Sequence, residues 1–217
     1  IGPGLAAFGL DDVLADPRLE LIGAAPVGAN DDWGTEPGLA AIFDATGAFA
    51  LSAGSRDAAL HRPALAPRPY SIVVEANGTP AGAVLAELFD ATPGSAFAPA
   101  TPRLVNVSVL QPSPAGTVLT AGFVLGGGTA RTVLVRAMGP SLTPFGLPAS
   151  QVLGDPRLAL FDGASRRIAG NDNWGGDPQL AAAGEAVGAF RPIAADSTDA
   201  MLLLTLPPGS YTAQVTG

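Results

Sequence analysis

The chain contains one block of sequence twice. Each of its two Trp residues lies in an acidic, glycine-rich loop, Trp33 in "ANDDWGTEP" (29–37) and Trp174 in "GNDNWGGDP" (170–178), which we call the Trp loops. Other stretches recur in the same order: "IGPGLAAFGL" (1–10) with "MGPSLTPFGL" (138–147), "DPRLEL" (16–21) with "DPRLAL" (155–160), and Tyr70 with Tyr211. The two Trp residues are 141 positions apart, and so are the two Tyr residues. Recurrence at a nearly constant spacing indicates two copies of one supersecondary unit.

The two copies differ at their ends. The first copy continues after its Tyr to an apolar run, "AVLAELFD" (83–90), whereas the second copy stops at "YTAQVTG". Three strand-like runs precede only the second copy: "RLVNVSVL" (103–110), "TVLTAGFVLG" (117–126) and "RTVLVRAMG" (131–139). We therefore expect a first domain over 1–93 without its opening strands and a second domain over 103–217 without its closing strand. The residues between them, 94–102, have the composition of a Pro/Ala linker.

Short apolar runs between turn residues predict the fold class. The chain has 28 Gly and 21 Pro, and runs such as "RLALFD" and "AMLLLTL" are bounded by Gly, Pro or Asp, as sandwich strands are. After the second Trp loop, Asp177 suits the N-cap of a helix and Pro178 its first position. The sequence predicts an all-β protein of two tandem jelly-roll-like or immunoglobulin-like β-sandwiches, each with one short helix after its Trp loop. The expected core positions are Leu19, Leu21, Leu158, Leu160, Leu202, Leu204 and Tyr211.

Charge and composition exclude several classes of partner and site. The net charge is −8, so the chain has no basic surface for nucleic acid or for an anionic membrane. No apolar run reaches the roughly 18 residues of a membrane-spanning helix. The chain has no Cys, which excludes disulfides and Cys-ligated zinc. An acidic, Cys-free β protein of this kind is expected to be extracellular or at the cell surface of a bacterium.

The second copy resembles a known family. The run from "DPRLALFD" through "GNDNWGG" to "PPGSYTAQVTG" is similar to the bacterial pre-peptidase C-terminal domain, and to related sandwich repeats found in tandem in very large secreted bacterial proteins. The similarity covers 155–217 and, in the first copy, 16–78. It implies a jelly-roll-like β-sandwich with an accessory role in secretion, attachment, or binding of polymer or calcium, without catalysis.

The residues needed for common catalytic mechanisms are missing. His61 is the only His, and no Ser lies in a G-x-S-x-G motif. The second copy has an apolar run at the position that corresponds to His61. We therefore expect no enzymatic activity and no resident cofactor.

The Trp loops are the best candidates for a site. Calcium prefers six to eight oxygen ligands, which Asp and Asn of a tight turn can supply. The candidate ligands are Asp16, Asn30, Asp31, Asp32 and Glu36 in the first copy, and Asp155, Asn171, Asp172, Asn173 and Asp177 in the second. The alternative is a turn held by Asx hydrogen bonds, in which Trp33 and Trp174 form a buried structural plug at the end of each sandwich. The turn is the favoured interpretation.

Two functions follow from these observations. The first is a structural or adhesive module, in which neighbouring subunits supply the missing strands and so assemble head to tail into a filament or surface array. The alternative is a carbohydrate-binding or accessory module of a secreted enzyme, with the two Trp rings as stacking platforms for polysaccharide. A binding Trp needs an exposed ring face, whereas a structural Trp is covered.

Overall fold

The computed structural model describes residues 1–78, 80–114 and 116–217, and the chain divides into two compact units, 1–106 and 107–217. Within the described residues, most of the regular structure is antiparallel β-sheet with a few short helices, so the predicted all-β fold class is confirmed at this level. The first unit contains β1 (Pro17–Ile22), β2 (Pro26–Asn30), α1 (Leu39–Thr46) and β3 (Ser71–Ala76), with short 3₁₀ helices at Pro3–Phe8, Trp33–Thr35 and Gly94–Ala96. The second contains β4 (Leu119–Leu125), β5 (Arg131–Ala137), β6 (Arg157–Asp162), β7 (Arg167–Asn171), α2 (Pro178–Ala186), β8 (Ala200–Leu206) and β9 (Gly209–Thr216), with 3₁₀ helices at Pro140–Phe145 and Ala149–Gln151.

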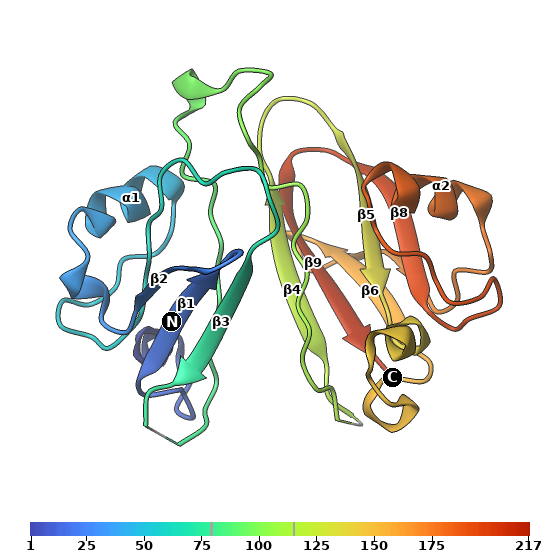
Figure 1. Ribbon diagram of the computed structural model, residues 1–217, viewed down its shortest axis with the longest axis horizontal. Helices are drawn as coiled ribbons and strands as arrows, with labels where there is room; N and C mark the ends of the chain where they lie inside the picture. The colour runs from blue at the N-terminus through green and yellow to red at the C-terminus, as the bar shows by residue number, and fades with distance from the viewer. Residues whose placement is uncertain (79, 115) are drawn as a thin grey trace. The chain divides into compact units, whose positions relative to one another are not determined.

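The first unit has one antiparallel sheet in the order β2-β1-β3 (Figure 1). Leu19 of β1 lies opposite Asn30 of β2 and Val74 of β3. The register of β1 against β2 shifts by one residue between Leu21 and Ile22, as at a β-bulge.

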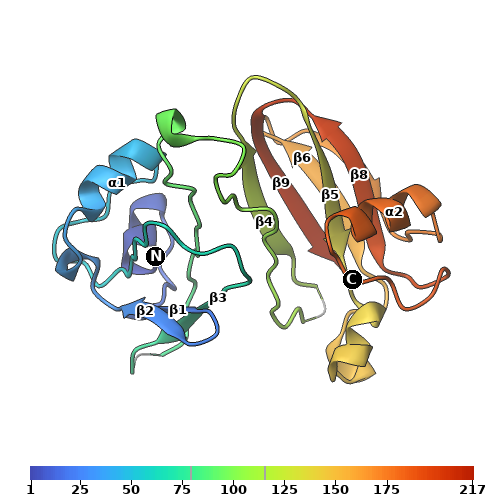
Figure 2. The ribbon, with the colours of Figure 1, turned by 45° about the horizontal axis from the view of Figure 1, so that its top comes forward.

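The second unit has two sheets, seen from a second direction in Figure 2. One has the order β4-β9-β6-β7, and the other pairs β5 with β8. Leu158 lies opposite Asn171 and Val215, and the β6–β7 register shifts between Leu160 and Phe161. Asn171 and Val215 thus flank Leu158 of β6 as Asn30 and Val74 flank Leu19 of β1 in the first unit.

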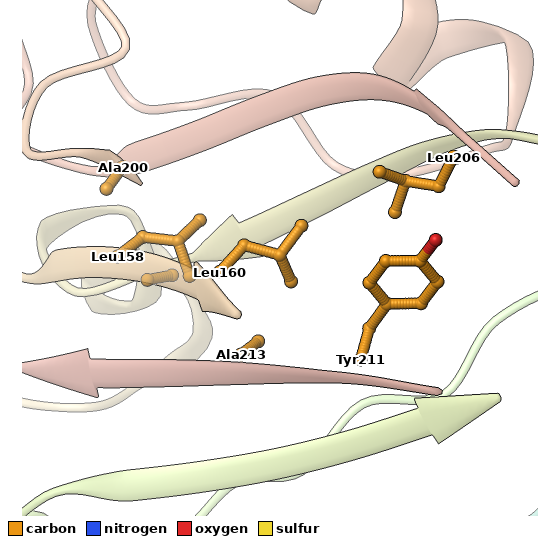
Figure 3. Close-up of a cluster of buried hydrophobic side chains, with 7 residues drawn as sticks. Leu158, Leu160, Ala200, Leu206, Tyr211 and Ala213 are labelled. Atoms are coloured by element: carbon orange, nitrogen blue, oxygen red, sulfur yellow. The ribbon is translucent and has the colours of Figure 1, made fainter. Parts of the chain in front are cut away.

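Both sheets of the second unit contribute to its core. Figure 3 shows Leu206 and Ala200 of β8 facing Tyr211 and Ala213 of β9, with the β6 leucines between them. Seven buried residues form this cluster: Ala137, Leu158, Leu160, Ala200, Leu206, Tyr211 and Ala213. The apolar alternation of β6 and β9 places one side of each strand in this cluster, as expected for strands with one covered face.

The expected core positions are only partly correct. Leu158, Leu160 and Tyr211 are buried, and Leu202 and Leu204 are half-buried against the same cluster. Leu19 and Leu21 of the first unit were expected in a core but are only half-buried. The first unit has no described second sheet to cover this face of β1, which explains their exposure.

A short helix follows each Trp loop. Asp177 caps α2 by accepting a hydrogen bond from the N–H of Gln179 at 2.7 Å, and Pro178 occupies the first helical turn. Both details agree with the sequence-based prediction. The cap of α1 is Gly38 and has no side-chain hydrogen bond, so α1 starts without this stabilisation.

Two predicted strands are absent from the described residues. The run 103–110 has no strand, and 83–90 has only an isolated bridge between Ala83 and Val13. Both predictions of strand were wrong for these runs. Their apolar pattern suits a strand, but a strand exists only where a neighbour pairs with its backbone groups.

Within the described ranges, no helix is long and apolar enough to cross a membrane.

Candidate functional site

The second Trp loop is covered. Trp174 is only 8% exposed and belongs to a small apolar cluster with Leu180 of α2 and Met201 of β8. Its indole N–H donates to the carbonyl oxygen of Ala194 at 3.1 Å and to the Ser197 hydroxyl at 3.0 Å. A ring that is covered in this way cannot stack on a sugar, so Trp174 does not meet the requirement for a carbohydrate platform.

The first Trp loop is more open. Trp33 is half-buried, and its indole N–H donates to the carbonyl oxygen of Ser52 at 3.1 Å. The ring lies 5.7 Å from that of Phe43 in α1, centroid to centroid. The expectation that both Trp residues are buried is therefore met by Trp174 and only partly by Trp33.

A buried carboxylate lies behind the second Trp loop. Asp199 is fully buried and accepts hydrogen bonds from the N–H groups of Gly139 (2.8 Å) and Ser141 (3.3 Å). Its carboxylate also accepts hydrogen bonds from the hydroxyls of Ser141 and Ser197. The backbone carbonyl oxygen of Asp199 accepts a hydrogen bond from the backbone N–H of Trp174 at 2.8 Å. This one residue therefore connects the start of a 3₁₀ helix, the Trp loop and the first residue of β8.

The first unit repeats this arrangement. Asp57 is fully buried and accepts from the N–H groups of Gly2 (2.8 Å) and Gly4 (3.1 Å) and from the Ser55 hydroxyl (2.7 Å). The backbone carbonyl oxygen of Asp57 accepts a hydrogen bond from the backbone N–H of Trp33 at 2.8 Å. Each carboxylate accepts hydrogen bonds from backbone and hydroxyl groups of separate segments, so each anchors those segments to one another.

Sequence reasoning missed Asp57 and Asp199. The signal was present, because "SRDA" (55–58) and "STDA" (197–200) recur with nearly the spacing of the Trp loops. Neither stretch looks catalytic, and burial of a lone Asp cannot be inferred from its neighbours in sequence.

The candidate calcium ligands make protein contacts. Asn30 and Asn171 each accept a backbone N–H, from Ala59 and Met201, both at 3.0 Å. Asp16 pairs with Arg56 and Glu36 with Arg62, each at 2.7 Å, while Asp177 caps α2. The remaining candidates lie exposed: Asp31, Asp32, Asp155, Asp172 and Asn173. Among the residues that the structure describes, no three His, Cys, Asp or Glu side chains are grouped as a metal site would require.

The exposed apolar surface concentrates in the two runs that lack strand partners. Val105 is 89% exposed, Leu110 70% and Val107 67%, and in the other run Leu88 and Phe89 are also exposed. Surface apolar residues that occur singly are normal, whereas contiguous ones mark interaction sites. The two runs therefore carry contiguous exposed apolar surface.

The two units differ in the described neighbours of their equivalent strands. In the second unit β4 pairs with β9, and Phe123 of β4 stacks on Tyr211 of β9 with ring centroids 5.4 Å apart. The strand of the first unit that corresponds to β9 is β3, and its described pairing is with β1 alone. Tyr70, which corresponds to Tyr211, is half-buried, and its hydroxyl donates to the Ala66 carbonyl at 3.0 Å.

Strand β5 carries a half-buried cation, Arg136. The Arg136 guanidinium donates to the Phe190 carbonyl at 2.6 Å and lies 4.5 Å from the centre of the Phe190 ring. Burial lowers the pKa of Arg136, and the negative charge of Asp199 partly opposes this. The side chain remains a cation at neutral pH because the ordinary pKa of an arginine lies far above neutrality.

Comparison with protein-family models, curated proteins and solved structures finds no match to this chain.

Proposed function

We propose that this chain is a non-catalytic structural or adhesive module that acts outside the cell. In this proposal it consists of two β-sandwich repeats that associate head to tail by strand addition. The carrying observation is that residues 86–90 and 103–110 have no strand partner among the described residues and bear exposed apolar side chains. A partner strand would satisfy the backbone groups and cover the apolar side chains in one step.

The duplication supports a structural role. The buried aspartates, the Trp N–H contacts and the Asn contacts occur once in each unit. Groups that recur in both units and bond to backbone hold the chain in shape, whereas a catalytic site is seldom needed twice in so small a chain. The extracellular location is part of the proposal and rests on the acidic, Cys-free composition alone.

Strand addition between different surfaces gives an open assembly. If one unit supplies a strand and the other unit receives it, the contact is heterologous. Each added copy then uses one of its two surfaces and leaves the other free for the next copy. Such a contact produces filaments or arrays and not a closed dimer.

The test is the mass of purified residues 1–217 by light scattering over a range of concentrations. We expect the mean mass to rise with concentration, with fibres at the highest concentrations. A folded monomer at every concentration would refute self-assembly.

The matched variant replaces Val105 and Val107 by Ser. These two side chains are exposed, so the change leaves both cores intact. If the runs carry the association, this variant stays monomeric over the range in which the parent chain associates.

A further inference from the structure

The outer face of the four-stranded sheet in the second unit carries two arginines. Leu158 and Leu160 of β6 point into the core, so Arg157, which alternates with them, points to the opposite face. Arg167 of β7 lies opposite Phe161, and directly opposed residues point to the same face of a sheet. Both arginines line one open depression of about 500 Å³ formed by β6, β7 and β9.

No acidic side chain neutralises these two arginines. Arg157 and Arg167 form no ion pair within the part of the chain that the structure describes. Asp172 also lines the depression, but it is exposed and contacts neither arginine as an ion pair. Two like charges in one depression repel each other, and a bound anion would remove that repulsion.

A glycine provides the space for the Arg167 guanidinium. Gly170 of β7 lies opposite Ala159 of β6, so it belongs to the same outer face. A Cβ atom on Gly170 would overlap Nη2 of Arg167, so the guanidinium occupies the space that a side chain would fill. The charged end of Arg167 therefore lies over β7, level with Ala159 and two positions along β6 from Arg157. The first unit has Ala29 in place of this glycine.

The duplication provides an internal control for this face. Arg18 of β1 corresponds to Arg157, because "DPRLEL" aligns with "DPRLAL". The Arg18 guanidinium pairs with Glu20 at 2.9 Å and with Glu75 at 3.6 Å. The first unit therefore neutralises its arginine with its own carboxylates.

The second unit has neither of these acids. Ala159 occupies the position of Glu20. Thr216 occupies the position of Glu75, since each lies opposite the arginine of its own unit. Arg167 adds a second cation where the first unit has a proline. The same face is thus neutralised in the first unit and left positive in the second, as an anion-binding site requires.

The other side chains of the depression indicate the kind of anion. Phe161, Gln214 and Thr216 are half-buried there. An aromatic ring offers apolar surface to the C–H face of a sugar, and amide and hydroxyl groups can bond to sugar hydroxyls. A guanidinium binds a carboxylate through two parallel hydrogen bonds. The net charge of −8 disfavours a densely charged polyanion, so a ligand with separate carboxylates fits best.

We propose that the outer face of β6, β7 and β9 binds an acidic oligosaccharide, with a carboxylate between Arg157 and Arg167. Phe161 contacts the sugar ring, and Gln214 and Thr216 hydrogen bond to its hydroxyl groups. The site lies within the second unit and goes beyond the proposed strand addition, because it needs no self-association.

The test is a titration of the full chain with trigalacturonate, a sugar trimer with one carboxylate on each ring, followed by amide NMR. We expect saturable shifts at Gly170 and Gln214. Ala29 and Val73, which occupy the same positions in the first unit, should not shift. The methyl ester of the trimer should bind at least about tenfold more weakly, because it offers no charged acceptor to the arginines.

Variants on the outer face test the two arginines. Arg157→Gln and Arg167→Gln change exposed side chains and should each weaken binding about tenfold. The matched control is Arg131→Gln, an exposed arginine of β5 outside the depression, which should bind within about twofold of the parent. Ala159→Glu restores the acid of the first unit and should also weaken binding about tenfold, although both arginines remain. Circular dichroism checks that each variant is folded.

The outcomes decide both the site and the ligand. Inorganic phosphate that shifts the same amides as strongly as trigalacturonate would overturn the saccharide assignment. No saturable shift with trigalacturonate, or equal weakening by Arg131→Gln, would overturn the site. Loss of binding with Arg157→Gln, Arg167→Gln and Ala159→Glu alone supports the inference. Light scattering of the same samples tests the proposed self-association separately.

Discussion

The buried carboxylate of Asp199 allows a quantitative test of how the second unit is held together. The proposed change is Asp199→Ala, which removes the acceptor for two backbone N–H groups and two hydroxyls. The hydroxyls can rotate to other acceptors, but the N–H groups of Gly139 and Ser141 are fixed by the backbone. Both residues are buried, so water does not readily replace the lost partner.

The expected loss follows from those two N–H groups. A buried donor left without an acceptor destabilises a protein by about 1–3 kcal/mol, so two of them give about 2–6 kcal/mol. Asp199→Asn should be milder, at about 1–2 kcal/mol, because the amide oxygen can still accept both N–H groups while the NH₂ faces hydroxyls that can accept. The control is Asp196→Ala, an exposed Asp three positions away, which should change stability by no more than about 0.5 kcal/mol.

The assay is urea unfolding followed by Trp fluorescence in a Trp33→Phe background, so that Trp174 is the only Trp and reports on the second unit. The free energy of unfolding is extrapolated to zero urea for each variant. An Asp199→Ala protein as stable as the Asp196→Ala control would refute the argument that this carboxylate anchors the 3₁₀ helix and the Trp loop.

Three further predictions concern the Trp loops and the β6–β7 turn. Trp174→Ala should lose about 3–5 kcal/mol of unfolding free energy in urea melts, and Trp33→Ala clearly less, because only the former ring is buried; equal losses would contradict this. Millimolar calcium should leave the calorimetric melting temperature unchanged, because Asp16 and Glu36 already pair with arginines and Asp177 caps α2. A clear rise in melting temperature would favour a calcium site. The N–H and guanidinium of Arg166 hold the pKa of Asp162 below its ordinary value, so this carboxylate stabilises the fold above the unfolded pKa and loses that effect as pH falls through its folded pKa. The difference in melting temperature between the parent and Asp162→Asn should therefore be present at pH 7 and vanish in acid, and a difference that grows on acidification would show the sign to be wrong.

Much of the local structure could be predicted from short stretches of sequence. The helix cap at Asp177 and Pro178 depends on contacts within two residues, so the local pattern was sufficient. Alternation along one strand predicted that Leu158 and Leu160 share a face, but their full burial depends on the second sheet, because Leu19 and Leu21 have the same pattern and are only half-buried. The calcium hypothesis could not be resolved in this way, because the arginines that pair with Asp16 and Glu36 lie 26 or more positions away in the chain.

The sequence by itself determined that the chain repeats one unit, that the repeat is rich in β-strands, and that a short helix follows each Trp. Only the tertiary structure decided which apolar runs are strands. "AMLLLTL" is β8 because β5 lies beside it, whereas the corresponding residues 58–64 of the first unit form no strand. The run 103–110 has a strand pattern and no strand partner among the described residues, and 83–90 has only the Ala83–Val13 bridge and the hydrogen bonds between Leu85 and Ile1. The physical reason is that a β-strand is stabilised by hydrogen bonds to a neighbour, and the neighbour is chosen by the fold and not by the strand's own residues.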